Sequence, residues 1–261
     1  MRCYKCRNEA IFFQPYSGRH LCSRHLTLDI EARSKRSIRS HRWIQPGDHI
    51  AVLVSDDRKS AALLCFLKKL TADRRDIRLS AVPACERDLR TGCPSAAVKV
   101  AETLRVPCIE LSLPGASVTA AEGTVTRVAM AVSLDDIAQG VLGQFLFGIA
   151  DRLVHPPADE GNHHPVIYPF IAVPSAELDL YWAIEGSGID IPPVTPCRDA
   201  VVRETGALLE DFSRRHPATK YALLHLAEQL GPVNAAAGVL TGSCGPCAGE
   251  RRTSPQKRPN S

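Results

Sequence analysis

Residues 49–70 constrain the fold more than any other stretch of this chain. An apolar run is followed by a short polar turn, SDDRKS, and then by a segment whose apolar residues recur with helical spacing. A buried strand that turns directly into a helix is the first unit of a parallel α/β sheet. The start of such a helix presents unpaired backbone N–H groups, which favour an anion such as phosphate.

Strand and helix patterns continue to alternate beyond this unit. We expect strands at residues 50–54, 77–82, 108–113 and 126–132, and helices at residues 29–45, 59–70, 96–104, 134–153, 176–185 and 199–230. Ser133 is placed to cap the helix that follows it, and Pro217 to interrupt the last helical region. Alternation of this kind predicts a doubly wound parallel sheet with a helical C-terminal region.

The same patterns divide the chain into five segments. They are a small knuckle at residues 1–28, a basic linker helix at 29–48, an α/β domain at 49–173, a helical region at 174–231 and a flexible tail at 232–261. With 261 residues, 44% of them hydrophobic, the chain is large enough to bury one sizeable core. The tail contains Cys244 and Cys247 without a second ligand pair, which is half of a zinc site or its remnant.

Composition limits the compartment and the partners. The chain shows no run of eighteen apolar residues and no signal-peptide pattern, so we expect a cytoplasmic protein that does not enter membranes. A net charge of +4 does not by itself imply nucleic acid, but basic residues gather before the first strand. These candidate RNA-binding residues are Arg33, Lys35, Arg36, Arg39 and Arg42.

Two short-spaced ligand pairs lie at the N-terminus: Cys3-x-x-Cys6 and Cys22-x-x-His25. Three thiolates and one imidazole suit a tetrahedral zinc ion, which would replace the hydrophobic core that so short a segment cannot build. The alternative is that these cysteines are buried without a ligand. A zinc ion here would be structural, since the protein would fill all four coordination positions.

Three blocks of the sequence resemble the tRNA 2-thiolation branch of the PP-loop (N-type ATP pyrophosphatase) family. They are the N-terminal CxxC and LCSRH with the basic helix after them, SLDDIAQGVLGQFLFGIADRL at residues 133–153, and the PCRDAVVRETG segment within residues 196–224. The resemblance implies an adenine nucleotide alpha-hydrolase-like fold, a tRNA partner, a sulfur-carrier protein and a homodimer. It places ATP and magnesium at Ser55, Asp56, Asp57, Arg58, Lys59 and Ser60, and catalytic groups at Asp135, Asp136 and Cys197.

The nucleotide loop departs from the family pattern Ser-Gly-Gly-x-Asp-Ser. Both glycines are replaced by aspartates, Asp56 and Asp57, and the acidic residue is replaced by Lys59. Glycine lets backbone amides approach a phosphate closely, whereas an aspartate adds a side chain and a negative charge. A repulsive pair of unit charges 4 Å apart costs about 4 kcal/mol at an effective dielectric of 20. A magnesium ion bound by both aspartates would invert this penalty.

The sulfur chemistry of the family uses a Cys-x-x-Cys pair and a later cysteine, which together hold an iron–sulfur cluster or act in catalysis. Cys197 matches the later one, but no cysteine occurs between Cys108 and Val132, where the pair should lie. One thiolate cannot hold a cluster that requires three, so an iron–sulfur cluster is not expected. The segment Ala131–Ser133 also replaces the family's Gly-His-Asn.

Two functions remain open from the sequence. In the first, ATP activates the uracil oxygen of tRNA as an adenylate, and a sulfur donor displaces AMP. In the second, a non-catalytic homologue keeps the fold and binds tRNA or a partner protein through its basic residues. We expect a tRNA 2-thiolation protein in which the ATP and sulfur chemistry is weakened or lost.

Overall fold

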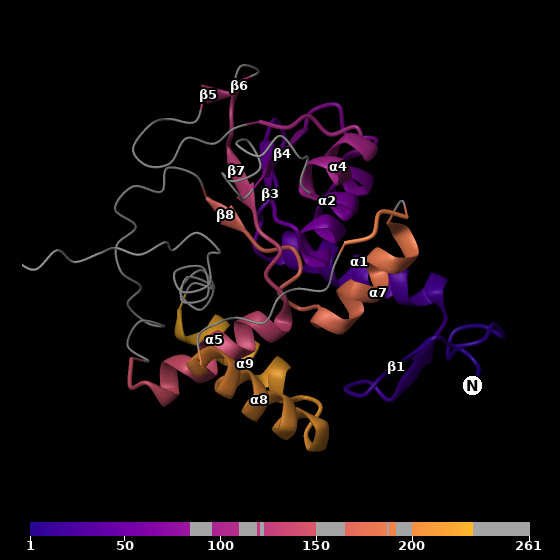
Figure 1. Cartoon of the computed structure of the whole chain (residues 1–261), viewed down its shortest axis with the longest axis vertical. Helices are drawn as coiled ribbons and strands as arrows, with labels where there is room; N and C mark the ends of the chain where they lie inside the picture. Colours follow the sequence, from indigo (N-terminus) through magenta and orange to yellow (C-terminus); the bar gives the residue numbers. More distant parts are fainter. Residues whose placement is uncertain are drawn as a thin grey trace, which may run out of the picture.

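The computed structural model describes residues 1–83, 96–109, 119–120, 123–149, 165–186, 188–191 and 200–231. Its centre is a parallel sheet (Figure 1). Helices α2 (Arg58–Thr71) and α4 (Ala96–Thr103) lie beside it. Helices α5 (Leu134–Leu146), α8 (Ala200–Arg215) and α9 (Thr219–Leu230) lie below it. The strands are β3 (His49–Val54), β4 (Arg78–Pro83), β7 (Arg127–Ala129) and β8 (Val166–Ile167). None of the helices in this part of the chain is long and apolar enough to cross a membrane.

The four strands lie in the order β4-β3-β7-β8, and every neighbouring pair is parallel. Cys108 extends the sheet beyond β4 by a parallel bridge to Ala81. Numbered along the chain, the five segments therefore follow the order 3-2-1-4-5 of doubly wound folds. This confirms the predicted α/β class, and the short β8 is the strand that the sequence patterns did not indicate.

Six helices follow the expected positions closely. They are α2 (Arg58–Thr71), α4 (Ala96–Thr103), α5 (Leu134–Leu146), α7 (Ser175–Glu185), α8 (Ala200–Arg215) and α9 (Thr219–Leu230). The break at Pro217 is confirmed. Helix α5 ends earlier than expected because Gly148 adopts a left-handed conformation, with φ of 68°, and the Ile149 N–H donates to the Gln144 carbonyl. Residues 150–153 of the helix expected at 134–153 lie outside the described part.

Helix α1 (Ser23–Ser40) begins six residues earlier and ends five residues earlier than the helix expected at 29–45. Its end is set by Arg42, which takes the left-handed conformation with φ of 52°. The Trp43 N–H then donates to the Ile38 carbonyl at 3.1 Å, the arrangement of a Schellman motif. Because the motif here uses arginine rather than glycine, the sequence carried no stop signal at this point.

The N-terminal segment forms a hairpin of β1 (Phe12–Gln14) and β2 (Arg19–Leu21), joined directly to α1. A second small hairpin pairs β5 (Thr119–Ala120) with β6 (Gly123–Thr124). Cys3, Leu21 and Cys22 belong to the same apolar core as α1, α2 and the sheet. The knuckle is therefore packed onto the α/β domain through its own buried side chains.

A buried polar cluster fixes the knuckle to the rest of the chain. Its centre is an ion pair between Arg33 on α1 and Glu177 on α7, whose side chains are 13% and 1% exposed. Glu177 also accepts hydrogen bonds from the Tyr16 hydroxyl at 2.5 Å and the Gln14 side-chain amide at 3.3 Å. The Arg33 guanidinium donates to the Tyr221 hydroxyl on α9 at 3.1 Å. One ion pair thus connects the hairpin, α1, α7 and α9.

Burial acts against both charges of this pair, and the attraction between them opposes that effect. Burial disfavours the Arg33 guanidinium, yet Glu177 and the neighbouring tyrosines hold the pKa of Arg33 above its usual value. Burial raises the pKa of Glu177, although Arg33 and Tyr16 oppose the rise. A pair of this kind depends on each partner, because removing one leaves an uncompensated buried charge.

We expect Arg33→Met to lower the free energy of unfolding by about 3 kcal/mol, because Glu177 would remain buried without its counter-charge. The matched control is Lys35→Met, since Lys35 lies on the same helix and makes only a half-exposed pair with Glu31. That variant should change stability by less than about 1 kcal/mol. Urea unfolding followed by circular dichroism measures both, and equal losses would contradict the role assigned to the buried pair.

Candidate functional site

The carboxyl ends of β3 and β7 form the point at which the strand order reverses. Open parallel sheets bind their ligands at such a switch point, because the loops after the two strands diverge there. The loop after β3 leads through Ser55 into α2, and the loop after β7 leads through Ser133 into α5. The fold therefore brings the predicted nucleotide loop beside the predicted catalytic aspartates.

The loop after β3 is held by hydrogen bonds of its own. Asp57 caps α2, its carboxylate accepting from the Ser60 backbone N–H at 2.9 Å, and it also accepts from the Ser55 hydroxyl. The Ser60 hydroxyl donates to the Ser55 and Asp57 carbonyls at 2.9 and 3.0 Å. The Ser60 backbone N–H at the start of α2, where a phosphate would bind, is thus already bonded to the Asp57 carboxylate.

Three further aspartates bond backbone N–H groups at the starts of helices. Asp56 accepts from the Ala97 N–H of α4 at 3.0 Å, and Asp135 accepts from the Ser175 N–H of α7 at 2.6 Å. Asp136 completes a capping box with Ser133 at the start of α5, as the sequence predicted for the Ser133 cap. All four aspartates of the site therefore satisfy helix N-termini, where negative charge is favoured.

Lys59 joins the two loops of the switch point. Its ammonium lies 2.7 Å from the Asp136 carboxylate, and both side chains are about a quarter exposed, at 22% and 27%. Burial disfavours the Lys59 charge, but the carboxylates of Asp136, Asp57 and Asp135 outweigh it and raise the pKa of Lys59. The ammonium remains charged and occupies the space between the two loops. Arg58 lies beside it and donates to the Ile191 carbonyl at 3.1 Å.

A pocket of about 280 Å³ adjoins the two aspartates of α5. Its other walls come from α7, α8 and α9, and they include Ser175, Glu210 and Lys220. The Lys220 ammonium lies 2.5 Å from Asp135 and 2.7 Å from Glu210. Although burial opposes ionisation, the hydrogen bonds from Lys220 and Ser175 lower the pKa of Asp135. The volume is at the small end for a ligand pocket.

Sequence reasoning did not single out Lys220 or Glu177, and it indicated Ser175 only as a cap for α7, whose N-cap is Pro174 instead. Their signal in the sequence is weak because each lies in an ordinary helical pattern, far along the chain from the residues it contacts.

Cys197, which the resemblance associates with catalysis, lies outside the described residues, as do Cys244 and Cys247. Cys65 on α2 is buried in the core at 3% exposure.

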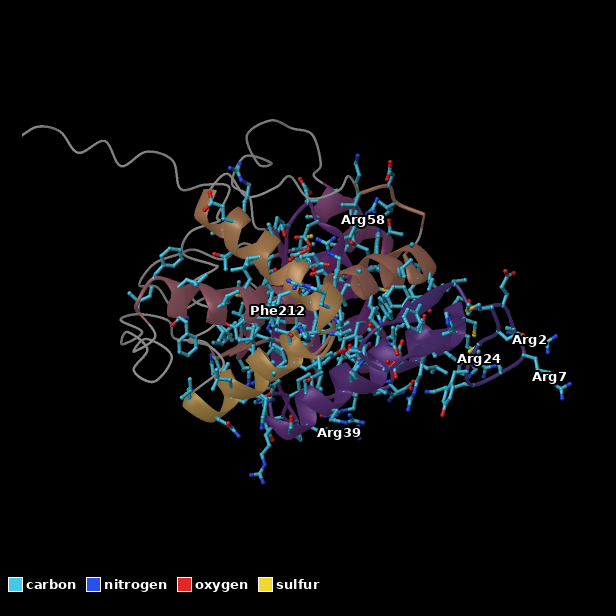
Figure 2. All side chains as sticks on the ribbon, turned by 90° about the horizontal axis from the view of Figure 1, so that it is seen from below. Arg2, Arg7, Arg24, Arg39, Arg58 and Phe212 are labelled. Atoms are coloured by element: carbon cyan, nitrogen blue, oxygen red, sulfur yellow. The ribbon has the colours of Figure 1, made fainter. Side chains whose placement is uncertain are left out.

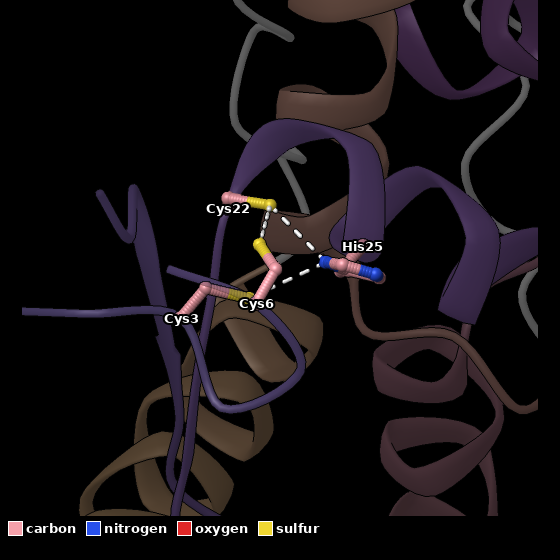
Figure 3. Close-up of side chains that lie close together, drawn as sticks. All are labelled: Cys3, Cys6, Cys22 and His25. Atoms are coloured by element: carbon pink, nitrogen blue, oxygen red, sulfur yellow. Dashed lines mark hydrogen bonds between the residues drawn. The ribbon is translucent and has the colours of Figure 1, made fainter. Parts of the chain in front are cut away.

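The N-terminal ligand set is assembled at one point (Figure 3). The ligand atoms of Cys3, Cys6, Cys22 and His25 all lie within 4.8 Å of one another. Cys6 Sγ is 3.7 Å from Cys22 Sγ, and His25 Nδ1 is 3.4 Å from Cys3 Sγ and 3.3 Å from Cys22 Sγ. Two sulfurs bound to one tetrahedral zinc ion at about 2.3 Å lie about 3.8 Å apart. The spacing therefore fits a single ion.

The ionisation of these thiols also suits a cation. Burial disfavours the Cys3 thiolate, but hydrogen bonds from the backbone of Cys22, Lys5 and Cys6 lower the pKa of Cys3 to about 6. The pKa of Cys6 is raised: the Asn8 backbone favours its thiolate, but burial and the neighbouring thiols outweigh this. A bound cation would remove the repulsion between adjacent thiolates, which are the metal-binding form.

The basic run of α1 is divided by the fold. Arg36, Arg39 and Arg42 are exposed and Lys35 is half-buried. Arg33 instead points into the buried cluster with Glu177, so the expectation that it contributes to an exposed basic surface is wrong. Figure 2 shows Arg39 on α1 and, further toward the end of the molecule, Arg24, Arg2 and Arg7.

Comparison with known proteins agrees with this arrangement. Residues 2–27 match the family model of the N-terminal LIM domain of the 2-thiouridine synthetase TtuA. Among solved structures, the chain is similar to the U34-tRNA thiolase NcsA from Methanococcus maripaludis with its [4Fe-4S] cluster, at a TM-score of 0.73 and 18% identity over 88% of each chain. No curated protein matches the chain. The N-terminal module and the fold are therefore similar to those of tRNA 2-thiolation proteins, which confirms the resemblance.

Proposed function

We propose that this chain is a tRNA-binding protein of the tRNA 2-thiolation type whose ATP chemistry is blocked. The observation that carries the proposal is the Lys59–Asp136 ion pair at the switch point. In the family pattern the residue at the position of Lys59 is acidic, so two carboxylates would face each other across the loops and share a cation. Here the ammonium of Lys59 supplies that positive charge from within the chain.

The anionic side of the site is also supplied by the chain. Asp57 holds the α2 N-terminus through the Ser60 N–H, and it must leave before a phosphate can use that group. Its carboxylate would otherwise lie against the phosphate, a repulsion of several kcal/mol at low effective dielectric. Magnesium-bound ATP therefore meets a site in which both its metal position and its phosphate position are filled.

The sequence also lacks most of the thiols that sulfur transfer in this family uses. The family chemistry draws on three cysteines, and the sequence retains only Cys197 of that set. NcsA is described with a [4Fe-4S] cluster, but clusters of this kind are held by several thiolates. The sequence supports a protein that keeps the fold and the RNA partner without the cluster.

We further propose that the N-terminal cluster holds one structural zinc ion through Cys3, Cys6, Cys22 and His25. Support comes from the mixed sulfur and nitrogen ligand set and from distances that fit one tetrahedral ion. An iron–sulfur cluster would attach its thiolates to separate irons, which requires a wider spacing than these ligands have. The bound ion would stabilise the knuckle, the helix start at Ser23 and the polar cluster behind them.

A second candidate function is ATP-dependent tRNA 2-thiolation with an altered loop. The retention of Asp135 and Asp136 at the switch point favours it, because these are the residues expected to organise metal and nucleotide. It requires Lys59 to leave Asp136 when nucleotide arrives. Cytoplasmic location, a sulfur-carrier partner and a homodimer are expected equally for both candidates.

We expect the native protein to show no binding of magnesium-ATP in calorimetry. The double variant Asp57→Gly/Lys59→Asp should bind magnesium-ATP at least tenfold more tightly than the detection limit of the native measurement. It frees the α2 N-terminus and restores a second carboxylate beside Asp136. Its matched control is Asp57→Gly/Lys68→Asp, which has the same charge change with the new aspartate on an exposed site at the far end of α2. The control should not gain affinity.

Tight binding of ATP by the native protein that is lost in Asp135→Ala would contradict the blocked site and favour the second candidate. Equal affinity in both double variants would show that general charge, rather than the Lys59 position, governs binding. The glycine at position 57 should be tolerated, because a glycine cap costs only a few tenths of a kcal/mol.

Metal analysis of the purified chain should find about one zinc per chain and no acid-labile sulfide. Cys3→Ser should lose the zinc and lower the melting temperature, because the knuckle has little core of its own. Cys108→Ser is the control, since Cys108 is an exposed thiol at the sheet edge away from the ligand set, and it should keep the zinc. Iron with labile sulfide, or a folded metal-free protein, would contradict the zinc proposal.

A further inference from the structure

The outer surface of the knuckle hairpin carries aromatic side chains that the core does not use. Tyr4 is 67% exposed and Phe13 is 46% exposed. Phe13 lies opposite His20 across the hairpin, with ring centroids 4.7 Å apart. The Tyr4 N–H donates to the His20 carbonyl at 2.7 Å, so Tyr4 is attached to β2 beside this pair. We call Tyr4, Phe13 and His20 the hairpin face.

The inner side of the same hairpin is fixed in the protein. Gln14 and Leu21 are 2% and 1% exposed, and Gln14 donates to Glu177 of the buried cluster. Alternate residues of a strand point to opposite sides, so anchoring these residues leaves Phe13 and His20 on the outer side. The hairpin face is therefore held on a rigid support, which lowers the conformational entropy lost on binding.

Positive charge surrounds the hairpin face. The Arg19 guanidinium lies over the Tyr4 ring at 4.9 Å from its centroid. The first 28 residues contain five basic residues and one acidic residue, a net charge of +4, and this equals the net charge of the whole chain. All five basic residues are exposed, and Figure 2 shows Arg2, Arg7 and Arg24 projecting at this end of the molecule. The excess positive charge of the protein is concentrated here.

We propose that the hairpin face binds unpaired bases of a single-stranded RNA segment, with bases stacking on Tyr4 and Phe13. Exposed aromatic rings combined with arginines are the means by which proteins bind single strands, since the rings receive bases and the cations contact the phosphates. This inference rests on the proposed RNA-binding function and assigns it a place on the molecule. Arg36 and Arg39 of α1 are further exposed basic residues outside the knuckle.

The chemistry distinguishes this partner from the other polyanions that a basic surface attracts. An acidic peptide would pair with the arginines but has no flat rings to stack on Tyr4 and Phe13. A paired RNA helix presents its phosphates but keeps its bases stacked inside, and proteins that read RNA sequence therefore target unpaired segments. Aromatic and basic groups together favour an unpaired strand.

The test is fluorescence anisotropy of the full-length, metal-loaded protein with a labelled ten-nucleotide unstructured RNA. Tyr4→Ala/Phe13→Ala should weaken binding at least tenfold, because two stacking positions are lost. Tyr4→Phe/Phe13→Tyr keeps both rings and should bind as the native protein does. Ile11→Ala, an exposed apolar change on the same module, and Phe212→Ala, an exposed aromatic change on α8, should leave the affinity unchanged.

The same oligonucleotide annealed to its complement and a polyglutamate peptide are the competing probes. The inference predicts that the single strand binds most tightly and that only its binding depends on the two rings. It is overturned if the double alanine variant binds the single strand normally, or if polyglutamate binding is equally sensitive to the rings. Zinc content and circular dichroism check that each variant is folded, and the ring-preserving variant decides the matter if the alanine variant is not.

Failure of this inference is distinguishable from failure of the proposed function. Native protein that binds tRNA through surfaces insensitive to Tyr4 and Phe13 would remove the hairpin face and leave the RNA-binding function intact. Native protein that binds neither tRNA nor the oligonucleotide would remove both. The slope of log affinity against log salt should stay the same in the double alanine variant, since its phosphate contacts are unchanged.

Discussion

The buried ion pair between Arg33 and Glu177 joins the N-terminal hairpin, α1, α7 and α9 at one point. The hairpin contacts it through Gln14 and Tyr16, and the C-terminal helices contact it through Tyr221. The hairpin, α1 and α7 also share one apolar core, and the Glu177 carboxylate adds directional hydrogen bonds to that packing. A pair this deeply buried contributes more to positioning than to net stability, because desolvation offsets much of its attraction.

The helices that contact this pair also contact the switch point. Glu177 lies in the first turn of α7, whose first residue, Ser175, donates to Asp135. Tyr221 follows Lys220 on α9, and Lys220 pairs with Asp135 from the other side. Asp135 is therefore held by two helices, α7 and α9, that also contact the buried Arg33–Glu177 pair.

The sequence predicted what depends on local pattern and missed what depends on distant contacts. The strand and helix at residues 49–70 and the cap at Ser133 were foreseen, because periodicity and capping chemistry are local. The true end of α1 was not, since its left-handed residue is Arg42 instead of glycine. Arg33 was assigned to an RNA surface because composition cannot show that a partner such as Glu177, 144 residues away, makes an arginine internal.

The substitutions in the nucleotide loop are mutually consistent in charge. Replacing glycine by Asp57 puts a carboxylate on the α2 N-terminus, and replacing the family's aspartate by Lys59 puts an ammonium against Asp136. Each change alone would leave an unbalanced charge: Asp57 without a nearby cation, or Asp136 without magnesium. Made together, they satisfy the helix N-termini and both aspartates without any ligand. On the proposed function, the loop would keep the charge balance of a nucleotide site while the chain itself supplies both charges.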